Sequence, residues 1–282
     1  MREETLLHLG PEGFHRVAYR EWGAHDNPEV LICVHGISRR ASDFDDIAQA
    51  LSNDYRVVCP DMPGRGLSDW MDDKSHYVQG LYLSICAALI ARTGARSVDW
   101  LGTSMGGRLG MALASTPNTP IRKLVINDIG PQVPAAGRAD NFAHFGTDPR
   151  FESEQAGMRY VRETRAAFGP TTEAAWLKFC KDSLRQMDDG QWTLHYDPGL
   201  KVTAGAAASS EAWQQWQRIT CPVYVLWGLK SKILIADVVE RMQTTGPKAE
   251  VFAVPYAGHC PRLENDEQID AVRQFLLSRP QA

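Results

Sequence analysis

Hydrophobic residues in the first half of the chain form short runs separated by segments with helical periodicity. The runs typical of strands are residues 30–34, 55–59, 98–101 and 121–127, and the most continuous of them, 30–34, indicates a strand buried on both faces. Two short β patterns precede them, at residues 6–9 and 16–22. Helical patterns lie between the runs, at residues 44–51, 77–92 and 108–115. This alternation predicts a mostly parallel sheet with helices on both faces.

The alternation stops after Pro131, and residues 132–216 carry helical patterns rich in aromatic side chains. It then resumes with strand and helix patterns in turn, at residues 223–227, 236–244, 250–254 and 266–277. We therefore expect one doubly wound α/β domain, built from residues 1–131 and 217–282. The 132–216 segment would be a helical insertion at the carboxyl ends of the strands, where ligands bind to such sheets.

Composition limits the partners. A net charge of −4 over 282 residues gives no reason to expect nucleic acid or an acidic membrane surface. No apolar run approaches the roughly 20 residues of a membrane span, and residues 1–4 are not followed by the apolar stretch of a secretory signal. The six cysteines include no Cys-x-x-Cys pair, which favours a reduced, cytoplasmic protein without a metal site. A small molecule is the expected partner, and the oligomeric state stays open.

Candidate chemistry begins with the segment Gly102-Thr103-Ser104-Met105-Gly106, between a predicted strand and a predicted helix. In that context a Gly-x-Ser-x-Gly turn strains the serine backbone and exposes its hydroxyl at the start of the helix. Ser104 is therefore the candidate nucleophile. A chance match is the alternative, since glycine and serine are common in turns.

A serine hydroxyl needs a base within hydrogen-bond reach. His259 is the best candidate among eight histidines, because it lies in an ordered turn between the last strand pattern and the last helix. An ordinary surface histidine is the alternative interpretation. Its neighbour Cys260 is interpreted as a bystander, because Ser104 occupies the glycine-flanked turn.

An oxyanion that develops during acyl transfer needs hydrogen-bond donors already in place. The turn His35-Gly36-Ile37 follows the first buried strand. We assign the backbone N–H groups of Ile37 and Met105 to this oxyanion hole. His35 itself is expected to support the loop.

Taken together, these segments resemble the α/β-hydrolase fold superfamily. The matching marks, in chain order from residue 30 to 280, are His35-Gly36, Asp61-x-Pro63-Gly64-Arg65-Gly66-x-Ser68, Gly102-x-Ser104-x-Gly106-Gly107, Asn127-Asp128-Ile129-Gly130-Pro131 and Gly258-His259. The resemblance implies a core interrupted by a helical cap at 132–216. It also implies a serine hydrolase mechanism that needs no cofactor.

The acidic member of the expected triad departs from the family pattern. Similar sequences often carry an aspartate where this chain has Lys232, which cannot accept a hydrogen bond from imidazolium. Asp128, just past the preceding strand, is the favoured acid, with a turn cap or hinge anchor as its alternative role. Asp237 is a second candidate, although it more simply caps a helix. A chain with no acid, slow or inactive, is the third interpretation.

Three side chains are candidates for substrate binding. Arg39, with its neighbour Arg40, could recognise a carboxylate at the pocket, although an exposed pair is an equal alternative. Lys232 could pair with Asp128 or bind an acidic substrate, but loop lysines are usually solvated. Trp213 could line the substrate path or pack the insertion onto the core.

The resemblance implies hydrolysis of a small carboxylic ester or lactone through an acyl-enzyme. Two alternatives use the same fold. One is a carbon–carbon bond hydrolase of a keto acid, which an arginine at the pocket would favour. The other is a catalytically degenerate member that binds a small molecule, for which Lys232 is the main argument.

Overall fold

The computed structural model describes residues 1–168, 172–203 and 211–278. The predicted insertion at 132–216 therefore includes two stretches, 169–171 and 204–210, that lie outside the described residues. The eight strands of the main sheet are β1 (Arg2–Gly10), β2 (Gly13–Trp22), β3 (Val30–Val34), β4 (Arg56–Pro60), β5 (Val98–Thr103), β6 (Ile121–Asn127), β9 (Val223–Gly228) and β10 (Glu250–Val254). Their order is β1-β2-β4-β3-β5-β6-β9-β10.

The sheet is parallel from β4 to β10, and only β1 and β2 run antiparallel to their neighbours. Its helices are α1 (Asp45–Leu51), α2 (Gln79–Thr93), α3 (Met105–Ala114), α8 (Ala236–Thr244) and α9 (Asp266–Leu277). Every strand and helix predicted for this part of the chain is present, with ends shifted by a few residues. The predicted mostly parallel α/β architecture is confirmed.

Alternation along β3 shows why both faces of the sheet are covered. Ile32 and Val34 belong to one buried cluster, which also contains side chains of α2 and α3. Leu31 and Cys33 belong to a second cluster, which contains side chains of α1 and α9. Successive strand residues point to opposite faces, so a continuous apolar run buries both.

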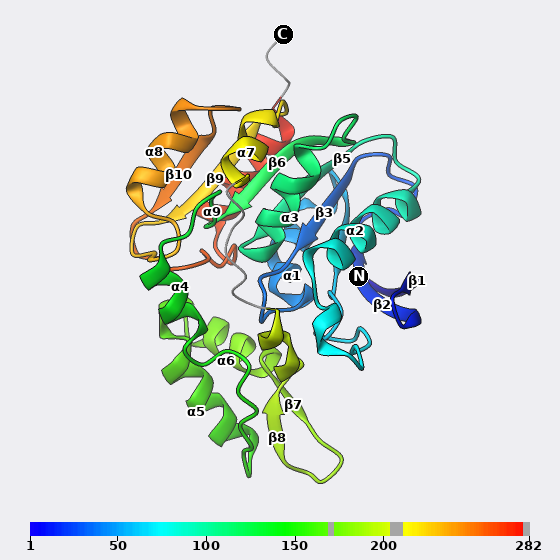
Figure 1. Cartoon of the computed structure of the whole chain (residues 1–282), viewed down its shortest axis with the longest axis vertical. Helices are drawn as coiled ribbons and strands as arrows, with labels where there is room; N and C mark the ends of the chain where they lie inside the picture. The colour runs from blue at the N-terminus through cyan, green and yellow to red at the C-terminus, as the bar shows by residue number, and fades with distance from the viewer. Residues whose placement is uncertain (169–171, 204–210, 279–282) are drawn as a thin grey trace.

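The chain between β6 and β9 lies mostly beyond one end of the strands of the sheet (Figure 1). Its elements are α4 (Ala135–Phe142), α5 (Glu154–Thr164), η3 (Ala166–Phe168), α6 (Glu173–Asp182), β7 (Leu184–Gln186), β8 (Trp192–Leu194), η4 (Pro198–Val202) and α7 (Ala212–Arg218). The hairpin β7–β8 was not expected, because its three-residue strands are too short to produce a periodic pattern. The last helix, α7, packs against α3 beside the sheet. No helix in the described ranges has both the length and the apolar character needed to cross a membrane.

Candidate active site

Ser104 stands at the junction of β5 and α3 with strained backbone angles, φ 51° and ψ −107°. Glycines make this turn possible. A side chain at Gly106 would overlap the carbonyl group of Val34, and one at Gly102 would overlap the backbone of Gly106. The backbone strain is of the kind stored at functional sites, and it presents the hydroxyl at the carboxyl edge of the sheet.

His259 connects Ser104 to Asp128. Its Nε2 lies 3.1 Å from the Ser104 Oγ, and its Nδ1 lies 2.8 Å from Oδ2 of Asp128. All three side chains were predicted from sequence, and the structure brings them together. The geometry allows the imidazole to accept the serine proton while the carboxylate orients the ring.

Asp128 is completely buried at the end of β6, with φ 55°. Its Oδ1 accepts a 2.9 Å hydrogen bond from the N–H of Gly228, and Oδ2 accepts a 2.6 Å bond from the hydroxyl of Ser231. Gly228 ends the neighbouring strand β9 and Ser231 follows it, and both donors hold the carboxylate toward His259. Ser231 was missed by the sequence analysis, although it directly precedes the anomalous Lys232.

The other acid candidate does not reach the imidazole. Asp237 is exposed in the first turn of α8, and Ile235 is the N-cap residue of that helix. Lys232 is exposed in the loop before α8, with its carbonyl group close to Gly137 of α4. Neither contacts His259. Asp237 is not the N-cap residue itself, but its carboxylate lies in the first turn, where a negative charge stabilises the start of the helix.

The proposed oxyanion donors lie next to Ser104. A Cβ placed on Gly36 would be 3.7 Å from the Ser104 Cβ, so the loop that carries Ile37 approaches the nucleophile closely. Within the described ranges no acceptor lies at hydrogen-bond distance from the Ile37 N–H. Met105 begins α3, where the first N–H groups have no partner in the helix. Both N–H groups can thus donate a hydrogen bond to a substrate oxygen.

The buried side chain of His35 supports that loop. His35 donates from Nδ1 to the Gly36 carbonyl (2.7 Å) and accepts at Nε2 from the Met62 N–H (3.0 Å). Burial, with help from the nearby Arg65 charge, lowers the pKa of His35 to about 3, so the ring is neutral. This matches the supporting role expected for His35.

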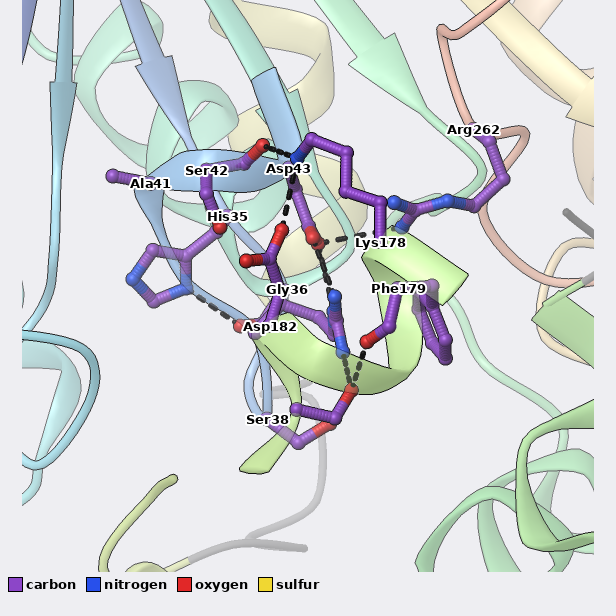
Figure 2. Close-up of polar contacts among 12 residues, drawn as sticks. His35, Gly36, Ser38, Ala41, Ser42, Asp43, Lys178, Phe179, Asp182 and Arg262 are labelled. Carbon is purple, nitrogen blue, oxygen red and sulfur yellow. Dashed lines mark hydrogen bonds and ion pairs between the residues drawn. The ribbon is translucent and has the colours of Figure 1, made fainter. Parts of the chain in front are cut away.

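A polar cluster joins the loop after β3 to α6 (Figure 2). Arg39 donates to both carboxylate oxygens of Asp43, at 2.6 and 2.8 Å, and to the hydroxyl of Ser183 at 2.5 Å. Lys178 of α6 donates to the Ser42 carbonyl and pairs with Asp182. The Arg39 guanidinium is therefore paired with the Asp43 carboxylate, and Arg39 is buried rather than exposed.

A small pocket lies beside Ser104 and His259. Its free volume is about 20 Å³, room for little more than one water, so substrate entry requires lining side chains to move. The residues from the 132–216 segment that line it are Phe145, Arg165 and Phe168, and Arg39 and Arg262 line it from the core.

The substrate-binding candidates Trp213, Lys232 and Arg40 lie outside this lining. Trp213 packs against the guanidinium of Arg241, 3.9 Å from its ring, between α7 and α8. Lys232 is on the outer loop, and Arg40 is the N-cap residue of η1 (Ala41–Phe44). The local sequence could not show that α7 turns back to pack beside the sheet. This packing places Trp213 away from the pocket. Arg165, Phe168 and Arg262 were not singled out, because no motif marks them.

No group of three histidine, cysteine, aspartate or glutamate side chains in the described part of the chain is arranged to hold a metal ion. The arrangement around Ser104 thus consists of a hydroxyl, an imidazole, a buried carboxylate and two free N–H groups. Such a set can activate a nucleophile and stabilise an oxyanion.

Comparison with known proteins agrees with this arrangement. The sequence model of the alpha/beta hydrolase family matches residues 31–272. The chain is 42% identical to a 3-hydroxybutyrate-oligomer hydrolase of Cupriavidus necator over 95% of both chains, and 24% identical to an esterase of Escherichia coli over 89% of this chain and 94% of the esterase. The crystal structure of an alpha/beta hydrolase from Novosphingobium aromaticivorans superposes with a TM-score of 0.89 and 30% identity, covering 98% of this chain and 97% of the other. The chain belongs to the alpha/beta hydrolase family and is an enzyme of that family.

Proposed function

We propose that the chain is a serine hydrolase that cleaves small carboxylic esters through an acyl-enzyme. The observation that carries the proposal is the placement of His259 between Ser104 Oγ (3.1 Å) and Asp128 Oδ2 (2.8 Å). No such continuous hydrogen-bonded line is needed for packing, and it is the arrangement that activates a serine.

The residues would act in two steps. In the first, the Ser104 Oγ bonds to the ester carbonyl carbon while His259 Nε2 takes the hydroxyl proton, and the Ile37 and Met105 N–H groups hold the oxyanion. The ester C–O bond then breaks, and His259 returns the proton to the leaving alcohol. In the second, His259 activates a water that releases the acid and restores Ser104.

The substrate class follows from the most similar relative cited above. That protein's name assigns it oligomers of 3-hydroxybutyrate, which are esters of a short hydroxy acid. We propose the same class for this chain, an oligoester of a short hydroxy acid, with simple esters and lactones as further substrates.

The 132–216 segment is proposed as a cap over the site, since Phe145, Arg165 and Phe168 line the pocket from it. Core segments 1–131 and 217–282 would carry the triad. We also propose a cytoplasmic location, on the grounds that all six cysteines are free.

The alternative of carbon–carbon bond hydrolysis depended on Arg39 or Arg40 at the pocket. Arg39 lines the pocket, but its guanidinium is held by Asp43 at two positions, and Arg40 is not among the lining residues. The degenerate-member alternative depended on a missing acid, and Asp128 is in hydrogen-bond contact with His259. Ester hydrolysis therefore has the better support.

The test is a fluorophosphonate probe combined with turnover of p-nitrophenyl acetate. Wild type should be labelled and show a burst of p-nitrophenol, and Ser104→Ala should lose both. Ser75→Ala, which changes an exposed serine of η2 (Lys74–His76), is the matched control and should retain both. Full turnover by Ser104→Ala would overturn the proposal.

A further inference from the structure

Three arginines line the pocket beside Ser104, and two of them face carboxylates. Arg39 pairs with Asp43 at 2.6 Å. Arg262 lies 3.5 Å from Asp43 and 3.8 Å from Glu264. The charges of these two side chains are thereby balanced within the protein.

Arg165 differs from both. Among the described residues, its one side-chain hydrogen bond is to the uncharged Tyr196 hydroxyl, at 3.5 Å, and no carboxylate lies within 4.0 Å of it. Burial lowers the pKa of Arg165, and the nearby positive charge of Arg39 lowers it further. The pocket therefore holds a partly desolvated cation without a matching anion.

Arg165 is also close to the proposed reaction centre. Its guanidinium carbon lies 5.8 Å from the centre of the Phe168 ring, and that ring lies 6.0 Å from the ring of His259. On its other side, Tyr196 stacks on Phe145, another pocket residue, at 5.4 Å. Aromatic walls of this kind hold the guanidinium in place and reduce competition from water.

We propose that Arg165 binds a free carboxylate of the substrate, so that the enzyme selects esters that carry a carboxylate over neutral esters. A planar guanidinium pairs with a carboxylate through two parallel hydrogen bonds, which suits this position. This inference rests on the proposed function and specifies its substrate. In an oligomer of a hydroxy acid, the free carboxylate is at one end, and the ester bond next to it would be placed at Ser104.

Cleavage there would release one hydroxy acid at a time from the carboxylate end. Ser104 Oγ bonds to the carbonyl carbon, the ester C–O bond breaks, and the departing alkoxide receives the serine proton through His259. The leaving molecule is the terminal hydroxy acid with its carboxylate intact. Water then frees the remaining acyl group from Ser104.

The experiment compares two forms of the linear dimer of 3-hydroxybutyrate: the free acid, and the same dimer with its terminal carboxyl converted to a carboxamide. The readout is the ratio of kcat/KM for the acid to kcat/KM for the carboxamide. Losing a charge-assisted hydrogen-bonded pair corresponds to a roughly 10- to 100-fold effect. Arg165→Gln should lower the ratio by that amount, and Arg165→Lys, which keeps the charge but not the planar fork, should lower it less.

Arg162→Gln is the matched control. Arg162 lies one turn before Arg165, in α5, where it is half-buried and pairs with Glu173 outside the pocket lining. Arg162→Gln should therefore keep the wild-type ratio of the two kcat/KM values. Thermal unfolding of each variant checks that the fold is intact. A wild-type ratio near one, or an equal loss on both dimers in Arg165→Gln, overturns the inference. Absence of fluorophosphonate labelling and of all ester turnover in wild type would instead overturn the proposed function.

Discussion

Arg65 donates from Nε to the carbonyl oxygen of Ile37 at 2.8 Å, and its Nη2 lies 3.6 Å from the sulfur of Met105. One fully buried guanidinium thus contacts both residues whose N–H groups we assign to the oxyanion. It comes from the turn-rich segment after β4, far from Ser104 in sequence. We therefore expect Arg65 to position the proposed oxyanion hole.

Replacing Arg65 with glutamine should lower kcat for p-nitrophenyl acetate by about 100-fold while KM changes little. The reason is that a misplaced oxyanion donor acts in the transition state, and loss of one such donor costs on the order of 10² to 10³ in kcat. The measurement is steady-state kinetics with circular dichroism to confirm folding.

Tyr82→Phe is the control for this prediction. It removes the 2.8 Å bond between Arg65 Nη1 and the Tyr82 hydroxyl but leaves the contact with Ile37. We expect a loss of stability of about 1 kcal/mol and a kcat close to wild type. If Arg65→Gln and Tyr82→Phe lost stability equally and neither changed kcat, Arg65 would have only a structural role.

Asp128→Asn should lower kcat by about 10⁴-fold, since an amide cannot hold the imidazole in the correct tautomer or stabilise its cation. Asp237→Asn removes the rival acid, which is exposed on α8, and should leave kcat at the wild-type value. Kinetics of the two variants on one ester separate the two assignments. A large loss in Asp237→Asn would favour the rival.

The elements that carry Ser104 and His259 could be predicted because their signals are local. A strand, a glycine-flanked turn and a helix follow one another directly at residues 98–114, and periodicity reveals each. The contact between Asp128 and His259 depends instead on the order β6-β9-β10 in the sheet, because Asp128 follows β6 and His259 follows β10. Strand order is set by packing of the whole domain, so the sequence left several acids open.

The ion pair and the burial of Arg39 could be predicted only in part. Asp43 lies four residues after it, and a pair at that spacing was readable in the sequence. The burial of that pair under α6 was not readable, because the contact between Arg39 and Ser183 spans 144 residues. The same limit applies to Arg165, whose place in the pocket depends on how the 132–216 segment folds over the sheet.

Gly106→Ala should abolish activity and reduce stability, because the added methyl group would overlap the Val34 carbonyl and force β3 away from the serine turn. Gly80→Ala is the matched change. Gly80 is exposed in the first turn of α2 with nothing within 4 Å of its Cβ position, so alanine should stabilise the protein by up to about 1 kcal/mol. Urea unfolding and ester turnover measure both. Full activity in Gly106→Ala would contradict the tight turn described for Ser104.

Stability should fall as the pH drops from about 6.5 toward 3, and His35 should contribute to that fall. Burial lowers the pKa of His35 from 6.5 to about 3 in the folded protein, so in this range the unfolded chain binds a proton that the folded chain does not. The free energy of unfolding then changes by up to about 1.4 kcal/mol per pH unit from this one group. His35→Asn should reduce the slope measured by urea unfolding between about pH 4 and 6, whereas His144→Asn, at an exposed position, should keep the wild-type slope. An unchanged slope in His35→Asn would mean that His35 becomes protonated without loss of the fold, contrary to its buried contacts with Gly36 and Met62.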